Sequence, residues 1–121
     1  MVQIRQAQLD AMSHELEERF VARMVRHLHD DFPEQCRSQG LTEERLEALT
    51  REGMARAAAY RVVDEADVQL YLECMVLLGS RFDVDRRFPW AGEILPHEGL
   101  TGTEKMDQVH DHLLFSLEPP V

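Results

Sequence analysis

Apolar residues recur at helical spacing near the N-terminus. Their intervals of three and four residues predict one long amphipathic helix from about Arg5 to Asp31, whose apolar stripe consists of Leu9, Met12, Leu16, Phe20, Met24 and Leu28. Pro33 ends this helix, because the residue before a proline is disfavoured in helical geometry. A short helix over Glu34 to Ser38 follows, and Gly40 is expected to close it in a left-handed conformation.

Two further main helices occupy the middle of the chain. Thr42 is a typical N-cap for a helix that reaches Tyr60, and Gly53 inside that helix suits a close approach by a neighbour. From Val68 to Leu78 nearly every residue is apolar, which is typical of a central, buried helix. Gly79 ends this apolar segment.

The C-terminal part predicts one short and one long helix. The short helix runs from Trp90 to Leu95 and is broken by Pro96. The last main helix runs from Glu104 to about Leu117, with either Thr101 or Thr103 as its N-cap.

No segment alternates apolar and polar residues as a strand does, and there is no internal repeat. The sequence therefore predicts an all-α fold, a small helical bundle of four main helices with one or two short ones. A length of 121 residues fits one core, so we expect a single domain over residues 1–121 with an ordered part at about 5–117.

Composition limits the classes of partner. The net charge is −10, and an acidic surface repels both phosphate backbones and anionic lipids, so nucleic acid and membrane partners are disfavoured. The N-terminal residues contain no apolar signal core, and the longest apolar run is far shorter than a membrane helix. We therefore expect a cytoplasmic protein whose partner is another protein, or a second copy in a homodimer.

Motifs for cofactors, metals and catalysis are missing from the sequence. Cys36 and Cys74 form no C-x-x-C pair, and the histidine pairs at 27/29 and 110/112 point to different sides of a helix. Asp83-Val84-Asp85 resembles the start of a calcium loop, but the later ligands and the glycine are not at the required spacing. No serine lies in a nucleophile elbow, and there is no phosphate-binding glycine loop. We expect no cofactor, no metal and no enzymatic activity.

The segment after the apolar helix is the most distinctive part of the sequence. Large aromatic residues beside arginines are typical of the residues that contribute most to protein interfaces. An alternative interpretation is that the aromatics close the end of the helical bundle, and the two roles are compatible. The predicted contact residues are Phe82, Asp83, Asp85, Arg86, Arg87, Phe88 and Trp90.

Several segments resemble a group of small bacterial proteins encoded beside type VI secretion spike proteins and their toxic effectors. They are residues 20–28 with Phe32-Pro33, residues 55–60, residues 67–73, and Phe82-Asp83 with Pro89-Trp90-Ala91. The resemblance covers roughly residues 5–95 and implies an adaptor or chaperone that holds an effector or helps to load it on the spike. It implies no role for any individual residue.

The function expected from the sequence is therefore that of a protein-binding accessory protein, an adaptor or chaperone for a type VI secretion effector or spike protein. Two alternatives remain open. One is an immunity protein that neutralises a cognate toxin, and the other is a homodimeric scaffold or regulatory module built on the long first helix.

Overall fold

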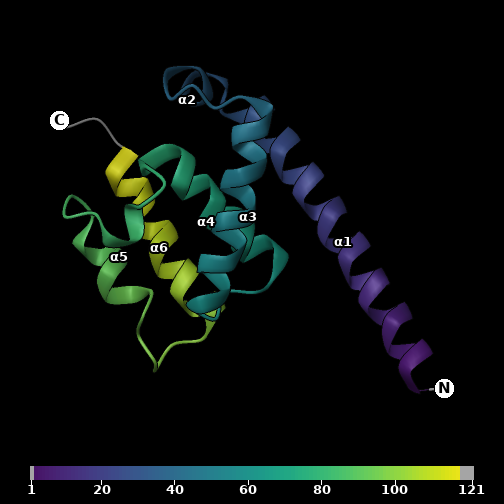
Figure 1. The fold of residues 1–121 in the computed structure, drawn as a ribbon. Coiled ribbons are helices and arrows are strands. Elements are labelled where there is room, and N and C mark those ends of the chain that lie inside the picture. Colours follow the sequence, from purple (N-terminus) through teal and green to yellow (C-terminus); the bar gives the residue numbers. More distant parts are fainter. Residues whose placement is uncertain (1, 118–121) are drawn as a thin grey trace. The chain divides into compact units, whose positions relative to one another are not determined.

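The computed structural model describes the backbone of residues 2–117 and the side chains of residue 8 and residues 11–117. Within this part of the chain there are six α-helices, a single 3₁₀ turn and no strand, which confirms the predicted all-α fold. Four of the helices are long and two are short, as expected (Figure 1). The elements are α1 (Val2–Asp31), α2 (Pro33–Ser38), α3 (Glu43–Ala59), α4 (Glu65–Leu78), η1 (Phe82–Val84), α5 (Pro89–Ile94) and α6 (Gly102–Leu117).

The chain divides into two compact units. Unit 1 comprises residues 1–47 and unit 2 comprises residues 48–121, so the boundary falls inside α3. The expected single domain over residues 1–121 stays a prediction, and each unit is described by itself. Among the described helices, none is both long enough and apolar enough to cross a membrane.

In unit 1, a proline, a glycine and a capping threonine determine how the chain passes from α1 to α3. Pro33 is the first residue of α2, and the amide of Phe32 still bonds to the carbonyl of Leu28 at 3.1 Å. Gly40 has a φ of 64°, the left-handed conformation expected after α2. The hydroxyl of Thr42 accepts a hydrogen bond from the amide of Arg45 at 3.3 Å, so Thr42 is the N-cap of α3, as predicted.

The apolar stripe of α1 is buried over only part of its length. Phe20, Met24 and Leu28 are buried, whereas Met12 and Leu16 are 60% and 61% exposed. Leu9 lies outside the described side chains. The periodicity therefore marks a buried face only from Phe20 to Leu28, because a period carries no information about how far along a helix that face is covered.

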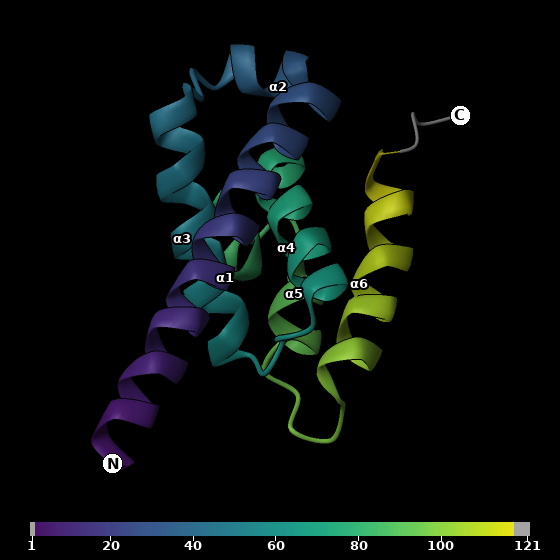
Figure 2. The ribbon, with the colours of Figure 1, turned by 90° about the vertical axis from the view of Figure 1, so that its right-hand side faces the viewer.

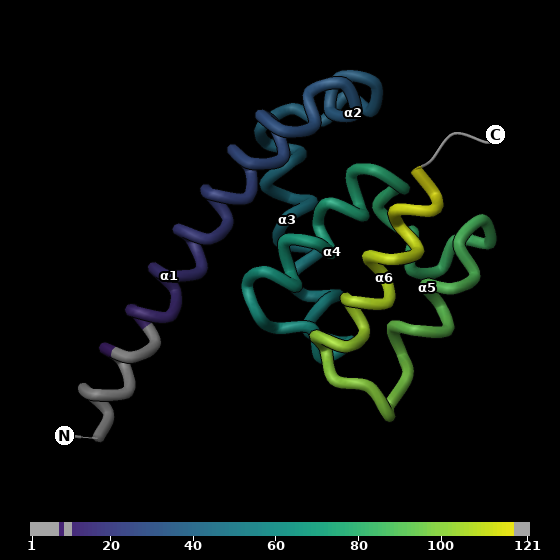
Figure 3. The backbone as a smooth tube through the Cα atoms, turned by 180° about the vertical axis from the view of Figure 1, so that it is seen from behind, coloured from purple at the N-terminus to yellow at the C-terminus, as the bar shows by residue number. Residues whose placement is uncertain are grey.

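Unit 2 is organised around α4, which is buried along most of its length, as predicted. The largest of its fully buried side chains are Tyr71, Leu72 and Met75. α4 lies beside α6, and α6 also contacts α5 (Figures 2 and 3). A Cβ atom at Gly53 would lie 2.4 Å from Cδ2 of Leu72, so α3 and α4 pack closely at the predicted glycine.

The end of α3 holds the start of α6. The helix stops at Ala59 because Arg61 adopts a φ of 65°, with the amide of Val62 bonded to the carbonyl of Ala57 at 2.8 Å. Gly102 packs directly on this turn, since a Cβ there would lie 2.4 Å from the carbonyl oxygen of Arg61.

The single lysine of the chain adds a second link between these helices. Lys105 is 3% exposed and donates from Nζ to the carbonyl oxygen of Tyr60 at 2.8 Å. A cation at this position complements the partial negative charge at the C-terminal end of α3.

Of the two threonines that the sequence offers as N-cap of α6, the structure selects Thr101. Its hydroxyl accepts a bond from the amide of Glu104 at 3.1 Å, and the Glu104 carboxylate accepts one from the amide of Thr101 at 2.9 Å. This reciprocal capping box holds the pKa of Glu104 below its usual value. Thr103 instead donates to Asp67 at 2.7 Å and so links α6 to the first turn of α4.

Candidate protein-binding surface

The segment that the sequence singled out begins inside the core of unit 2. Phe82 is fully buried and lies 5.1 Å from the ring of Tyr71, and Asp83 is 3% exposed. The Asp83 carboxylate accepts hydrogen bonds from the guanidinium of Arg56 and from the hydroxyl of Tyr60, the latter at 2.7 Å. Arg56 also donates to the carbonyl of Ser80 at 2.7 Å. These bonds attach η1 and the turn before it to α3.

This network corrects part of the predicted contact surface. Phe82 and Asp83 were expected to contact a partner, but their side chains are enclosed by the fold and cannot reach one. Asp83 is buried because Arg56 and Tyr60, which come from a distant part of the chain, provide its charge and hydrogen-bond partners. Burial and the bond to Asp83 raise the pKa of the Tyr60 hydroxyl to about 12, so it remains a donor at neutral pH.

After η1 the chain returns to the surface in a tight turn. The Asp85 carboxylate accepts bonds from the backbone amide of Arg87 at 2.9 Å and from its Nη2 at 2.8 Å. These bonds hold the pKa of Asp85 below its ordinary value. The Arg87 guanidinium lies 5.2 Å from the centre of the Phe88 ring, and Arg86 beside it is exposed. The turn therefore presents two arginines next to an aromatic ring.

The two remaining aromatics of the segment form a surface group with a residue of α6. Phe88 and Trp90 are half-buried, with ring centres 6.0 Å apart. Trp90 stacks on His112 at 5.1 Å with nearly parallel rings, 6° apart. We call Phe88, Trp90 and His112 the aromatic group. It attaches α5 to α6 and leaves part of its surface open, which fits both interpretations of these aromatics.

The sequence analysis missed the contribution of α6 to this surface. Phe115 is 78% exposed and lies one turn beyond His112 on the same helix face, and Leu114 and Leu117 are about half exposed. The signal was present in the sequence, because four of the last five residues of α6, positions 113–117, are apolar and a single inward face cannot include them all.

The described residues offer little for cofactor or metal chemistry. No three histidine, cysteine or carboxylate side chains among them lie close enough to hold a metal ion. Cys36 and Cys74 are buried, and burial raises the pKa of both thiols, that of Cys74 to about 12. Both thiols are therefore protonated at neutral pH and poor nucleophiles.

The chain was compared with models of protein families, with curated proteins and with solved structures, and none of them matches it. The resemblance to proteins encoded beside type VI secretion genes therefore stays a prediction.

Proposed function

We propose that this protein acts by binding another protein, as an adaptor or chaperone for a type VI secretion effector or spike protein. The observation that supports binding is the partly open aromatic group of Phe88, Trp90 and His112, beside the exposed ring of Phe115. The class of partner rests on the sequence resemblance alone. The proposal assigns no reaction to the protein.

The aromatic group suits a protein contact for physical reasons. Phe88 and Trp90 are already held in place by their contacts with Arg87 and His112, so little side-chain entropy is lost when a partner covers them. Tryptophan and arginine are also enriched among the side chains that contribute most to binding energy in interfaces. The exposed Phe115 adds apolar surface that a partner would remove from water.

A tagged form of the protein, recovered from a lysate of its native cell and analysed by mass spectrometry, tests this proposal. The wild type is expected to recover an effector or spike protein, and Trp90→Ala to recover at least about tenfold less of it. Val63→Ala is the matched control, because Val63 is 70% exposed in the loop between α3 and α4 of the same unit. Equal recovery by the two variants would remove the aromatic group from the interface.

A second candidate function is a self-associating module built on α1. Its support is the exposure of Met12 and Leu16, which continue the buried stripe of that helix toward the N-terminus. A dimer that covers them would be converted to monomer by Leu16→Glu, as measured by light scattering over a concentration series. A monomeric wild type at every concentration would exclude this candidate.

A further inference from the structure

The last turn of α6 exposes apolar side chains beside the aromatic group. Phe115 is 78% exposed, and Leu114 and Leu117 are about half exposed. His112, which stacks on Trp90, lies one turn before Phe115 on the same helix. A partner that covers this end of α6 therefore removes apolar area from water, which favours binding.

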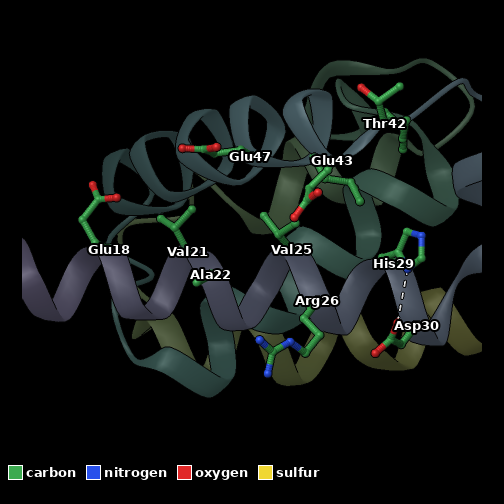
Figure 4. A pocket seen from close by; sticks show the side chains of 12 residues that line it. Glu18, Val21, Ala22, Val25, Arg26, His29, Asp30, Thr42, Glu43 and Glu47 are labelled. Carbon is green, nitrogen blue, oxygen red and sulfur yellow. Dashed lines mark hydrogen bonds and ion pairs between the residues drawn. The ribbon is translucent and has the colours of Figure 1, made fainter.

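The hollow of about 500 Å³ in unit 1, between the middle of α1 and the start of α3, offers less apolar surface (Figure 4). Its apolar lining residues Val21, Val25 and Leu46 are buried. Because these side chains are already removed from water, a ligand in the hollow would gain little by covering them.

The segment that leads into the aromatic group is a turn that presents arginine. The amide of Phe88 donates to the carbonyl of Asp85 at 3.0 Å, which closes a turn with Arg86 and Arg87 at its centre. The Asp85 carboxylate binds both the amide and the guanidinium of Arg87, so that arginine is already paired. Arg86 is exposed, and its side chain has no hydrogen-bond or ion-pair partner among the residues that the structure describes.

This turn is cationic although the chain as a whole is acidic. Both acids of the segment, Asp83 and Asp85, already bind an arginine. Arg81 and Arg86 are exposed and have no acidic partner within the described part of the chain. They therefore place uncompensated positive charge beside Phe88 in a protein whose net charge is −10.

Acidic residues also lie next to the aromatic group, on α5 and α6. Glu93 is exposed one turn after Trp90 on α5, and Asp111 is exposed next to His112 on α6. A carboxylate of a partner would be repelled by these two residues and attracted by Arg86. The charges therefore favour one orientation of an acidic segment, with its carboxylates at the turn and its apolar side chains toward α6.

We propose that the turn at Arg86, the aromatic group and Phe115 together bind a segment of the partner protein in which one or two apolar side chains lie next to aspartate or glutamate. The inference rests on the proposed function, because it names the chemistry of the segment that the aromatic group would bind. Apolar side chains that cover Trp90 and Phe115 supply most of the affinity, since exposed ion pairs contribute little. Carboxylates that pair with Arg86 determine which segments are accepted and make binding weaken with salt.

The net charge argues against other occupants of this surface. A nucleic acid could place a phosphate at Arg86, but its remaining phosphates would be repelled by an acidic protein. A second copy of the chain would bring a further net charge of −10, which opposes association. A short acidic segment of another protein needs only the local positive charge of the turn.

Selection of short random peptides from a displayed library on the purified full-length protein tests the proposal. The wild type is expected to select peptides that combine aspartate or glutamate with leucine or an aromatic residue, and these peptides are expected to bind less to Trp90→Ala and to Phe115→Ala. The Phe115 substitution changes an exposed side chain, so it leaves the fold intact. Peptides that depend on Trp90 and Phe115 but carry no excess of acids would overturn this inference and leave the aromatic group as a contact surface. The absence of any such dependent peptide would overturn both.

A labelled form of a selected peptide then measures the role of Arg86 by fluorescence anisotropy. Arg86→Ala is expected to weaken binding about threefold and Arg86→Glu at least about tenfold. Replacing the acids of the peptide by lysine is expected to weaken binding to the wild type and to restore part of the binding to Arg86→Glu. A loss of structure in the variant could not produce this restoration.

Arg26→Glu is the matched control for Arg86→Glu. It makes the same charge change at an exposed arginine of unit 1 whose side chain points away from α3 (Figure 4). It is expected to leave binding within about twofold, because only the overall charge changes. Circular dichroism of each variant shows whether it is folded.

Three outcomes of these measurements contradict the proposal. Equal effects of the Arg86 and Arg26 substitutions would show attraction by the overall charge alone. Unchanged binding of the lysine peptide to the wild type would show that carboxylates are not recognised. A concentration-dependent dimer of the protein that Arg86→Glu disrupts would make a second copy the occupant.

Discussion

The bond between Arg56 and Asp83 holds η1 against α3, a few residues before the aromatic group. Asp83→Asn tests how much this bond stabilises unit 2. The substitution keeps the size of the side chain but removes its charge. Arg56 is then left with a mostly buried guanidinium, 20% exposed, that has lost its carboxylate. Tyr60 loses the strong acceptor for its hydroxyl.

The expected loss follows from this geometry. Removing one partner of a buried ion pair costs about 3–5 kcal/mol of unfolding free energy, because the other charge stays buried without compensation. Arg56 keeps some exposure and also lies 3.6 Å from Glu52, so the lower end of that range, about 3 kcal/mol, applies. For a urea dependence of about 1.5 kcal/mol per molar, this loss moves the unfolding midpoint down by about 2 M.

Urea unfolding followed by tryptophan fluorescence measures this loss. The chain has one tryptophan, Trp90, so its fluorescence reports the unfolding of unit 2. Asp85→Asn is the matched control, because the same chemical change two residues later removes only the acceptor of the exposed Arg87. Its effect is expected to be clearly smaller. Equal midpoints for the two variants would refute the reasoning that burial makes the Asp83 pair matter.

Three further predictions concern packing and pH. Gly53→Ala adds a Cβ 2.4 Å from the Leu72 side chain and should destabilise by about 1–2 kcal/mol in urea unfolding, since overpacking outweighs the helix propensity that alanine gains; a more stable variant would contradict the tight contact. Stability should fall as pH rises from about 10 to about 12, because the unfolded chain releases the Tyr60 proton near pH 10 and the folded chain holds it to about 12. Tyrosinate absorbance checks this, and Tyr60→Phe should reduce the loss. In acid, the stability that Glu104 contributes is present above its ordinary pKa and disappears as pH falls through its lowered folded value. Glu104→Gln should therefore make the thermal unfolding midpoint depend less on pH on the acid side, and an unchanged pH profile would contradict a stabilising role of the capping box.

Much of the fold was predictable because its signals are local. Proline at the start of α2, glycine at its end and Thr42 before α3 each act through the geometry of a few neighbouring residues. The apolar run of α4 was recognised as central because a helix without a polar face has no stable exposed position.

The candidate site was predicted only in part, because burial depends on contacts between distant residues. Asp83 and Asp85 look alike in the sequence, two acids beside arginines, yet Asp83 is enclosed by residues of α3 and Asp85 is not. The partnership of Trp90 with His112 likewise joins positions that no local pattern connects.

Photo-crosslinking in the native cell tests most directly whether the surface around the aromatic group binds another protein. A photoreactive phenylalanine analogue replaces Phe115, which is exposed beside the aromatic group, and in a separate strain replaces Val63 as the control. The account predicts a defined cross-linked product from position 115 that contains an effector or spike protein, and no such product from position 63. No product from position 115, or the same products from both positions, would contradict it.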